Sequence, residues 1–127
     1  MRHRAGKELR LKNGREISRI FHEGLRARDA HLTLLADRRG EGELLPSRVA
    51  AAVSSRHGNA VARNRVKRMC REAFRTSRRR LPAGWDFIML PRPGSDPTVE
   101  RLQDSLTALA AKIVTTAERT KDTPDDS

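Results

Sequence analysis

The pattern of apolar and polar positions predicts three helices and three strands, and the first helix spans residues 14–23. Asn13 can cap this helix, and Glu16 stands three residues later, where the acid of a capping box is placed. Gly24 is a typical residue for the end of a helix. One apolar edge is expected to face the core, made of Ile17, Ile20 and Phe21.

Two strands are predicted next, over residues 31–38 and 48–55. The stretch between them is rich in Gly and contains one Pro, so we expect a turn that joins the two strands as a hairpin. A further strand around residues 40–46 is an open alternative. The second strand carries small side chains on one face, which indicates that another group approaches it closely; these are Ala50, Ala52 and Ser54.

The strongest helical pattern covers residues 60–78, with Asn59 as the expected N-cap. Its apolar stripe comprises Val66, Met69, Cys70, Ala73 and Phe74. A short apolar strand over residues 85–90 and a helix over residues 98–118 follow. This order of elements predicts an α/β (α+β) two-layer sandwich, in which about three helices pack on a small mixed sheet. Residues 1–10 are expected to form a flexible basic arm, residues 11–118 a single α/β domain, and residues 119–127 a disordered polar tail.

Charge changes this picture, because the chain carries a formal net charge of +11 and has a pI near 11.4. Residues 56–80 contain ten Lys or Arg and one acid, Glu72, a net charge of +9. On a helical projection Asn64, Arg68, Arg71 and Arg75 lie opposite the apolar stripe, while Arg63, Lys67 and Arg65 flank it. A solvated surface helix usually mixes signs, so this face indicates a polyanionic partner.

Other chemistry finds little support in the residues. Cys70 is the one cysteine and lies on the apolar stripe, which favours a buried structural thiol over a nucleophile. The histidines and carboxylates show no metal-ligand spacing, so we predict neither catalytic residues nor a metal site in the protein. His57 fits a phosphate contact or a plain loop residue. Phe74, Trp85 and Phe87 are expected in the core. With no signal peptide and no membrane-length apolar run, a cytoplasmic protein without membrane contact is expected.

The run Gly58-Asn59-Ala60-Val61-Ala62-Arg63-Asn64-Arg65-Val66-Lys67-Arg68 resembles the signature of the protein subunit of bacterial ribonuclease P. "REAFR" and "GWDFIMLPRPG" are similar to its continuation, and the resemblance extends over residues 11–115. It implies a left-handed β-α-β crossover through the basic helix, against the usual right-handed preference. It also implies a function, removal of the 5′ leader from precursor tRNA. In this family the catalytic RNA performs the hydrolysis with Mg²⁺, and the protein binds that RNA and the leader, assisting substrate recognition and metal affinity.

The same resemblance implies site residues. Those that match the family's RNA-binding helix are Arg63, Asn64, Arg65, Lys67, Arg68 and Arg71, to which the basic run adds Arg56 and Arg75. Phe21 matches an aromatic residue of the leader cleft, Ile17 and Leu34 stand at or near positions where relatives often have aromatic residues, and Ala52 and Ser54 correspond to the cleft floor. A general or ribosome-associated RNA-binding protein without a catalytic role is the alternative, because charge and fold fit it equally well.

Overall fold

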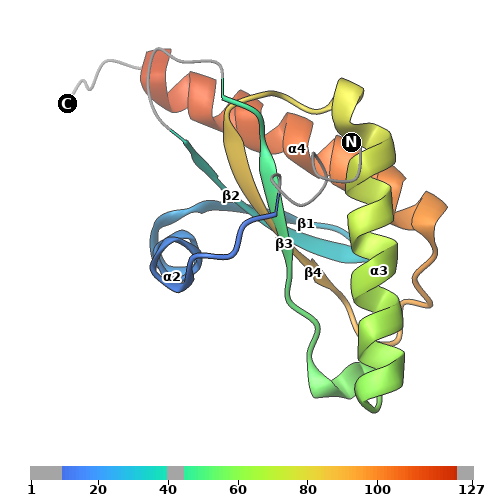
Figure 1. Ribbon diagram of the computed structural model, residues 1–127. Helices are drawn as coiled ribbons and strands as arrows, with labels where there is room; N and C mark the ends of the chain where they lie inside the picture. The colour runs from blue at the N-terminus through green and yellow to red at the C-terminus, as the bar shows by residue number, and fades with distance from the viewer. Residues whose placement is uncertain (1–9, 40–44, 123–127) are drawn as a thin grey trace, which may run out of the picture.

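The structure, a computed structural model, describes residues 10–39 and 45–122. These residues form one four-stranded sheet and three α-helices (Figure 1). The elements are α2 (Gly14–Glu23), β1 (Leu25–Arg28), β2 (Leu32–Arg38), β3 (Arg48–Ala51), α3 (Ala60–Ser77), β4 (Trp85–Pro91) and α4 (Val99–Asp122), with short 3₁₀ turns η1 (Ser55–His57) and η2 (Arg78–Arg80).

The order of strands in the sheet is β1-β2-β4-β3, so the predicted hairpin between residues 31–38 and 48–55 is wrong. β2 pairs antiparallel with both β1 and β4, and β3 pairs parallel with β4. Nearly every side chain of β4 is buried, and a strand buried on both faces belongs in the interior of a sheet. β4 therefore pairs with β2, in the position where the predicted hairpin would have placed β3. The hairpin that does form joins β2 to β1, a four-residue strand that the sequence pattern did not indicate.

The connection from β3 through α3 to β4 is a left-handed crossover. Figure 1 looks along the sheet from its β3 edge: β3 runs downward in front, α3 returns upward on the right, and β4 runs downward behind β3. The path from β3 through α3 to β4 turns counter-clockwise as it moves away from the viewer, so the crossover is left-handed. The handedness implied by the family signature is thus confirmed, although the general rule for parallel strands predicts the opposite.

The helices pack on the sheet as a sandwich, as predicted. α3 and α4 cover one face, where they bury the larger core with Leu34, Phe87 and Leu106 among its fully buried members. α2 lies across part of the opposite face, over a smaller cluster of Leu11, Ile20, Leu35 and Ile88. Since α2 covers only part of this face, a portion of the sheet remains accessible beside it.

Most helix boundaries agree with the sequence pattern. Asn13 Oδ1 accepts hydrogen bonds from the backbone N–H groups of Arg15 (2.9 Å) and Glu16 (3.1 Å), which satisfies the first turn of α2. α4 continues to Asp122, four residues past the predicted end, so the polar tail does not begin at residue 119. Residues 123–127, the arm up to residue 9, and residues 40–44 of the alternative strand lie outside the described residues; the remaining two residues of that strand, 45 and 46, are not extended into the sheet.

Candidate RNA-binding surfaces

Helix α3 separates its apolar and basic side chains as the sequence predicts. The apolar stripe is buried, with Met69 half-buried beside it. Of the predicted RNA-binding residues of α3, Asn64, Arg65, Arg68 and Arg75 are exposed, whereas Arg63, Lys67 and Arg71 are half-buried at the margins. Burial of the stripe against the sheet and α4 offsets the repulsion between like charges on the outer face. The result is a basic surface on the outer side of α3.

The start of α3 is held by the signature residues themselves. Asn59 Oδ1 accepts the backbone N–H of Ala62 at 3.0 Å, as an N-cap does. Gly58 has φ = 120°, and a Cβ there would stand 3.0 Å from the Ala62 Cβ, so another residue would be strained. His57 lies against the end of β4, where its Nε2 is 2.9 Å from the Pro91 carbonyl oxygen. This contact ties the turn η1 to β4, which fits the loop role expected for His57, while a phosphate contact stays a prediction. Arg56 beside it is exposed.

Within α3 only one of the arginines is neutralised by a carboxylate of the described residues. Arg75 Nη2 lies 2.6 Å from Glu72 Oε2, and this hydrogen bond lowers the pKa of the Glu72 carboxyl. Burial, followed by the nearby charge of Arg10, lowers the pKa of Arg71. The repulsion between the positive charges of Arg10 and Arg71 favours the binding of an anion near them. Arg63 also has a buried Nε for which the described residues provide no acceptor.

The second surface is the part of the sheet beside α2. Four partly buried side chains surround the small cluster and form its accessible rim: Ile17, Ala50, Ala52 and Leu90. Phe21 on α2 is 39% exposed. The chain has three Phe, one Trp and no Tyr, and the other three rings are buried in the larger core as predicted, so Phe21 is its one exposed aromatic ring. An exposed aromatic ring of this kind can stack on a base of a single-stranded nucleic acid.

Leu34 does not join this surface. It is fully buried on the opposite face, in the core formed with α3 and α4, so it cannot line a cleft beside Phe21. Its neighbour Leu35 belongs to the small cluster under α2. Side chains alternate along a strand, so an error of one position moves a residue to the other face. Of the other predicted floor residues, Ala52 lies on the surface, and Ser54 follows it, exposed, with its Oγ accepting from Arg56 N at 3.3 Å.

These surfaces can be compared with known proteins. Residues 6–114 match the family model described as Ribonuclease P. The ribonuclease P protein component of Brevibacillus brevis is 36% identical over 98 residues, which cover 76% of each chain. That of Bacillus pumilus is 33% identical over 108 residues, 84% of this chain and 88% of its own. The chain belongs to the ribonuclease P protein family.

Solved structures of the family share the fold. The ribonuclease P protein of Thermotoga maritima gives a TM-score of 0.70 at 28% identity, covering 82% of this chain and 96% of that one. A Staphylococcus aureus ribonuclease P protein, a mutant with defective mRNA degradation activity, gives 0.69 at 26% identity, covering 90% and 92%. Together the matches confirm the function that the signature implied: the chain is the protein component of ribonuclease P, which removes the 5′ leader of precursor tRNA, and it works with an RNA partner. They give no support to a general RNA-binding protein.

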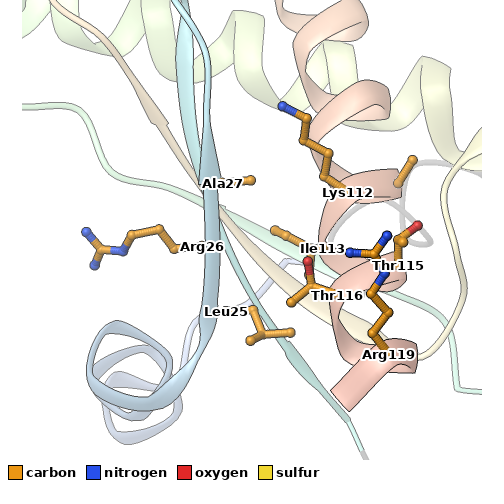
Figure 2. A pocket seen from close by; sticks show the side chains of 9 residues that line it. Leu25, Arg26, Ala27, Lys112, Ile113, Thr115, Thr116 and Arg119 are labelled. Atoms are coloured by element: carbon orange, nitrogen blue, oxygen red, sulfur yellow. The ribbon is translucent and has the colours of Figure 1, made fainter. Parts of the chain in front are cut away.

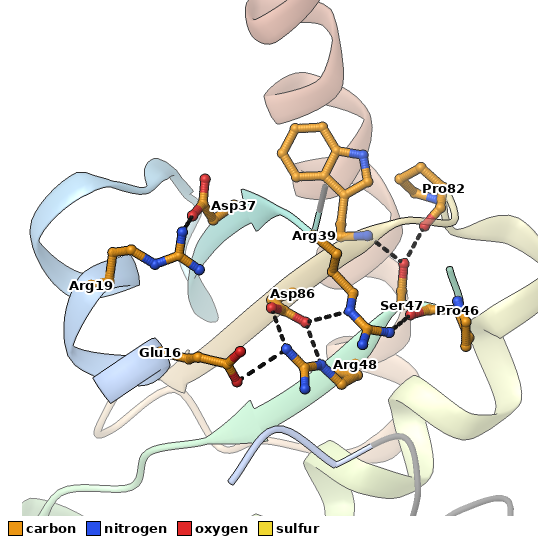
Figure 3. Close-up of polar contacts among 10 residues, drawn as sticks. Glu16, Arg19, Asp37, Arg39, Pro46, Ser47, Arg48, Pro82 and Asp86 are labelled. Carbon is orange, nitrogen blue, oxygen red and sulfur yellow. Dashed lines mark hydrogen bonds and ion pairs between the residues drawn. The ribbon is translucent and has the colours of Figure 1, made fainter. Parts of the chain in front are cut away.

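In this ribonuclease P protein one end of the sheet is held by a buried carboxylate that the sequence pattern did not reveal (Figure 3). Asp86 at the start of β4 is 1% exposed, and Arg48 of β3 donates to both of its oxygens at 2.7 Å. Arg39 approaches Asp86 at 3.6 Å, and Arg48 also donates to Glu16 of α2 at 3.1 Å. Hydrogen bonding to Asp86 raises the pKa of the Arg48 guanidinium. The network fixes α2 and β3 to β4.

A shallow hollow of about 490 Å³ lies on the other side of β1, toward α4 (Figure 2). Leu25 and Ala27 point toward α4, and Lys112 and Thr115 stand on that helix, whereas the side chain of Arg26 projects from the opposite side of the strand. The hollow is therefore separate from the surface beside α2. Across residues 10–39 and 45–122, no group of three His, Cys, Asp or Glu could hold a metal ion, and no helix could span a membrane.

Proposed function

We propose that the outer face of α3 binds the catalytic RNA of ribonuclease P, and that the sheet surface beside α2 binds the 5′ leader of precursor tRNA. The observation that carries this proposal is the segregation of α3: its stripe is buried in the core, while Asn64, Arg65 and Arg68 are presented together to the outside. Arginine binds phosphate with two parallel hydrogen bonds, so a row of arginines suits an RNA backbone. Asn64 adds a donor and an acceptor for a sugar or a base edge.

The leader is the part of the substrate that suits the second surface. A single strand exposes its bases, and Phe21 is the ring on which one of them can stack, for about 1–3 kcal/mol. Ala50 and Ala52 allow the strand to lie close to the sheet. With one exposed ring in the chain, leader binding depends on phosphate contacts as much as on stacking.

Hydrolysis itself is assigned to the RNA subunit with Mg²⁺. When bound, Mg²⁺ polarises a phosphate oxygen and activates water. The ligands we expect for it are RNA phosphates, since the cationic surfaces of the protein suit phosphate better than metal. By holding the leader and the RNA in one orientation, the protein lowers the Mg²⁺ concentration at which the complex reacts.

Cleavage of a leader-bearing precursor tRNA by a bacterial ribonuclease P RNA at low Mg²⁺, with and without the protein, tests the proposal. Strong stimulation at the mature 5′ end is the expected result, with no cleavage by the protein alone. Arg65→Ala with Arg68→Ala should abolish stimulation by weakening RNA binding, and Lys112→Ala on α4 is the matched control. Cleavage by the protein alone, or full stimulation by the double variant, would overturn the assignment.

A further inference from the structure

Strand β1 carries two arginines on the same side of the sheet as α2. Its residues alternate between half-buried and exposed, so that Leu25 and Ala27 pack on the larger core and Arg26 and Arg28 point the other way. The close-up shows this for Arg26, whose side chain leaves the strand on the side opposite to Ala27 (Figure 2). Both arginines belong to the edge strand of the sheet, beyond which residues 10–39 and 45–122 form no further strand.

The pairing register places Arg28 at the end of a partly exposed row of the leader surface, and Arg26 at the end of the neighbouring row, whose middle is buried under α2. Arg28 pairs with Thr33, which pairs with Leu90 of β4. Arg26 pairs with Leu35, and that row continues through Ile88 to Ala50 on β3. Paired residues share a face, so the row from Ala50 of β3 ends at Arg26 and the row from Leu90 of β4 ends at Arg28.

The arginines of this side differ in what they contact. Arg19 is 2.9 Å from Asp37, and Arg48 is held by Asp86 and Glu16. For Arg26 and Arg28, by contrast, residues 10–39 and 45–122 supply no ion pair and no hydrogen bond to the guanidinium. The two edge cations are therefore available to an anion that arrives across the sheet.

We propose that Arg26 and Arg28 bind phosphates of the 5′ leader at the β1 edge, upstream of the nucleotides that lie over Ala50 and Ala52 at β3. The inference rests on the proposed leader surface and extends it to the β1 edge. Three strand spacings of about 4.8 Å separate β3 from β1, a distance of about 14 Å. A stacked strand with a rise of about 3.4 Å per nucleotide needs about four nucleotides to cover it. Short leaders end before β1, and longer ones reach it.

Leader length therefore provides the test. Arg26→Gln and Arg28→Gln, singly and together, are assembled with ribonuclease P RNA, and affinity is measured for precursor tRNAs with leaders of about two and about ten nucleotides. The double variant should bind the long-leader substrate about tenfold more weakly and the short-leader substrate unchanged. Lys112→Gln removes one charge beside the hollow on the opposite side and should affect neither.

Two results would overturn this role, and they are distinguishable from failure of the leader surface itself. Equal weakening with both leaders would show general attraction instead of a contact at a fixed distance. Unchanged affinity for long leaders, with Phe21→Ala still weakening them, would leave the leader surface in place without the arginines. If Phe21→Ala and Ala52→Arg also had no effect, the surface beside α2 would not be the leader site.

Discussion

Asp86 connects the ends of several elements through one carboxylate. It is buried at the start of β4, and its two oxygens accept from Arg48, with Arg39 close by. A buried carboxylate of this kind stabilises only while its partners remain, because an unpaired charge in the interior is strongly unfavourable. The position of β3 beside β4, and with it Ala50 and Ala52, depends on this contact.

Asp86→Asn should lower the free energy of unfolding by about 3 kcal/mol, since it leaves Arg48 with a neutral partner in a buried place. Asp37→Asn is the matched control. The Asp37–Arg19 pair has side chains 28% and 42% exposed, so its loss should cost less than about 1 kcal/mol. Urea titration of the two variants and the unaltered protein measures both effects. Equal losses would contradict the special role of Asp86.

Cys70 provides a prediction about pH. Burial raises the pKa of its thiol from the ordinary value of 9.0 to about 12. Between these values the unfolded chain loses the proton and the folded one keeps it, so the thiol's contribution to stability is complete below pH 9 and is lost as pH rises toward 12. At pH 8 a disulfide reagent should label the folded protein far more slowly than the urea-unfolded chain, and Cys70→Ser should not react. Fast labelling of the folded state would contradict the burial of Cys70.

Helix α3 has two faces that can be altered separately. Its periodic stripe made both its limits and its buried side predictable from the sequence, because a helix of 18 residues repeats the pattern five times. The exposed arginines make no contribution to the core, and the stripe makes none to the outer surface.

Arg65→Ala or Arg68→Ala should weaken RNA binding while leaving the melting temperature nearly unchanged. Val66→Asp, one residue from Arg65, should unfold the protein, because it places a charge at a position that is 6% exposed. Circular dichroism melting and RNA filter binding separate the two outcomes. Weakened binding in the arginine variants that accompanies unfolding would contradict the division of α3 into two faces.

Elements without a strong local pattern could not be predicted. β1 has four residues, of which two are arginines, so its apolar positions are too few to indicate a strand. Its pairing with β2 is fixed by the core beneath Leu25 and Ala27, a tertiary effect. The buried position of Leu34 could not be predicted either, since the face on which a strand residue lies depends on a register that the sequence does not specify. Arg48 and Asp86 are 38 positions apart, and nothing local joins them.

For the molecule as a whole, charge determines how binding responds to salt. Of the net charge of +11, residues 56–80 supply most, so contacts to RNA phosphates should concentrate there. A plot of log affinity against log salt should be linear and steep, and each arginine removed from α3 should reduce the slope by roughly 0.7–0.9. Measurement of the dissociation constant at several salt concentrations, for the protein and for Arg68→Ala, tests this. A flat plot would show that binding is not electrostatic.

The place of β4 in the sheet has a consequence for synthesis of the chain. β4 lies between β2 and β3, and its register joins Asp37 to Asp86, 49 positions later. A nascent chain that ends before β4 has the β1–β2 hairpin and β3, but not the strand that joins them. The four-stranded sheet therefore cannot form until residues up to Pro91, of the 127 in the chain, have emerged from the ribosome. Until then the basic helix leaves the ribosome without a core to pack on, close to ribosomal RNA.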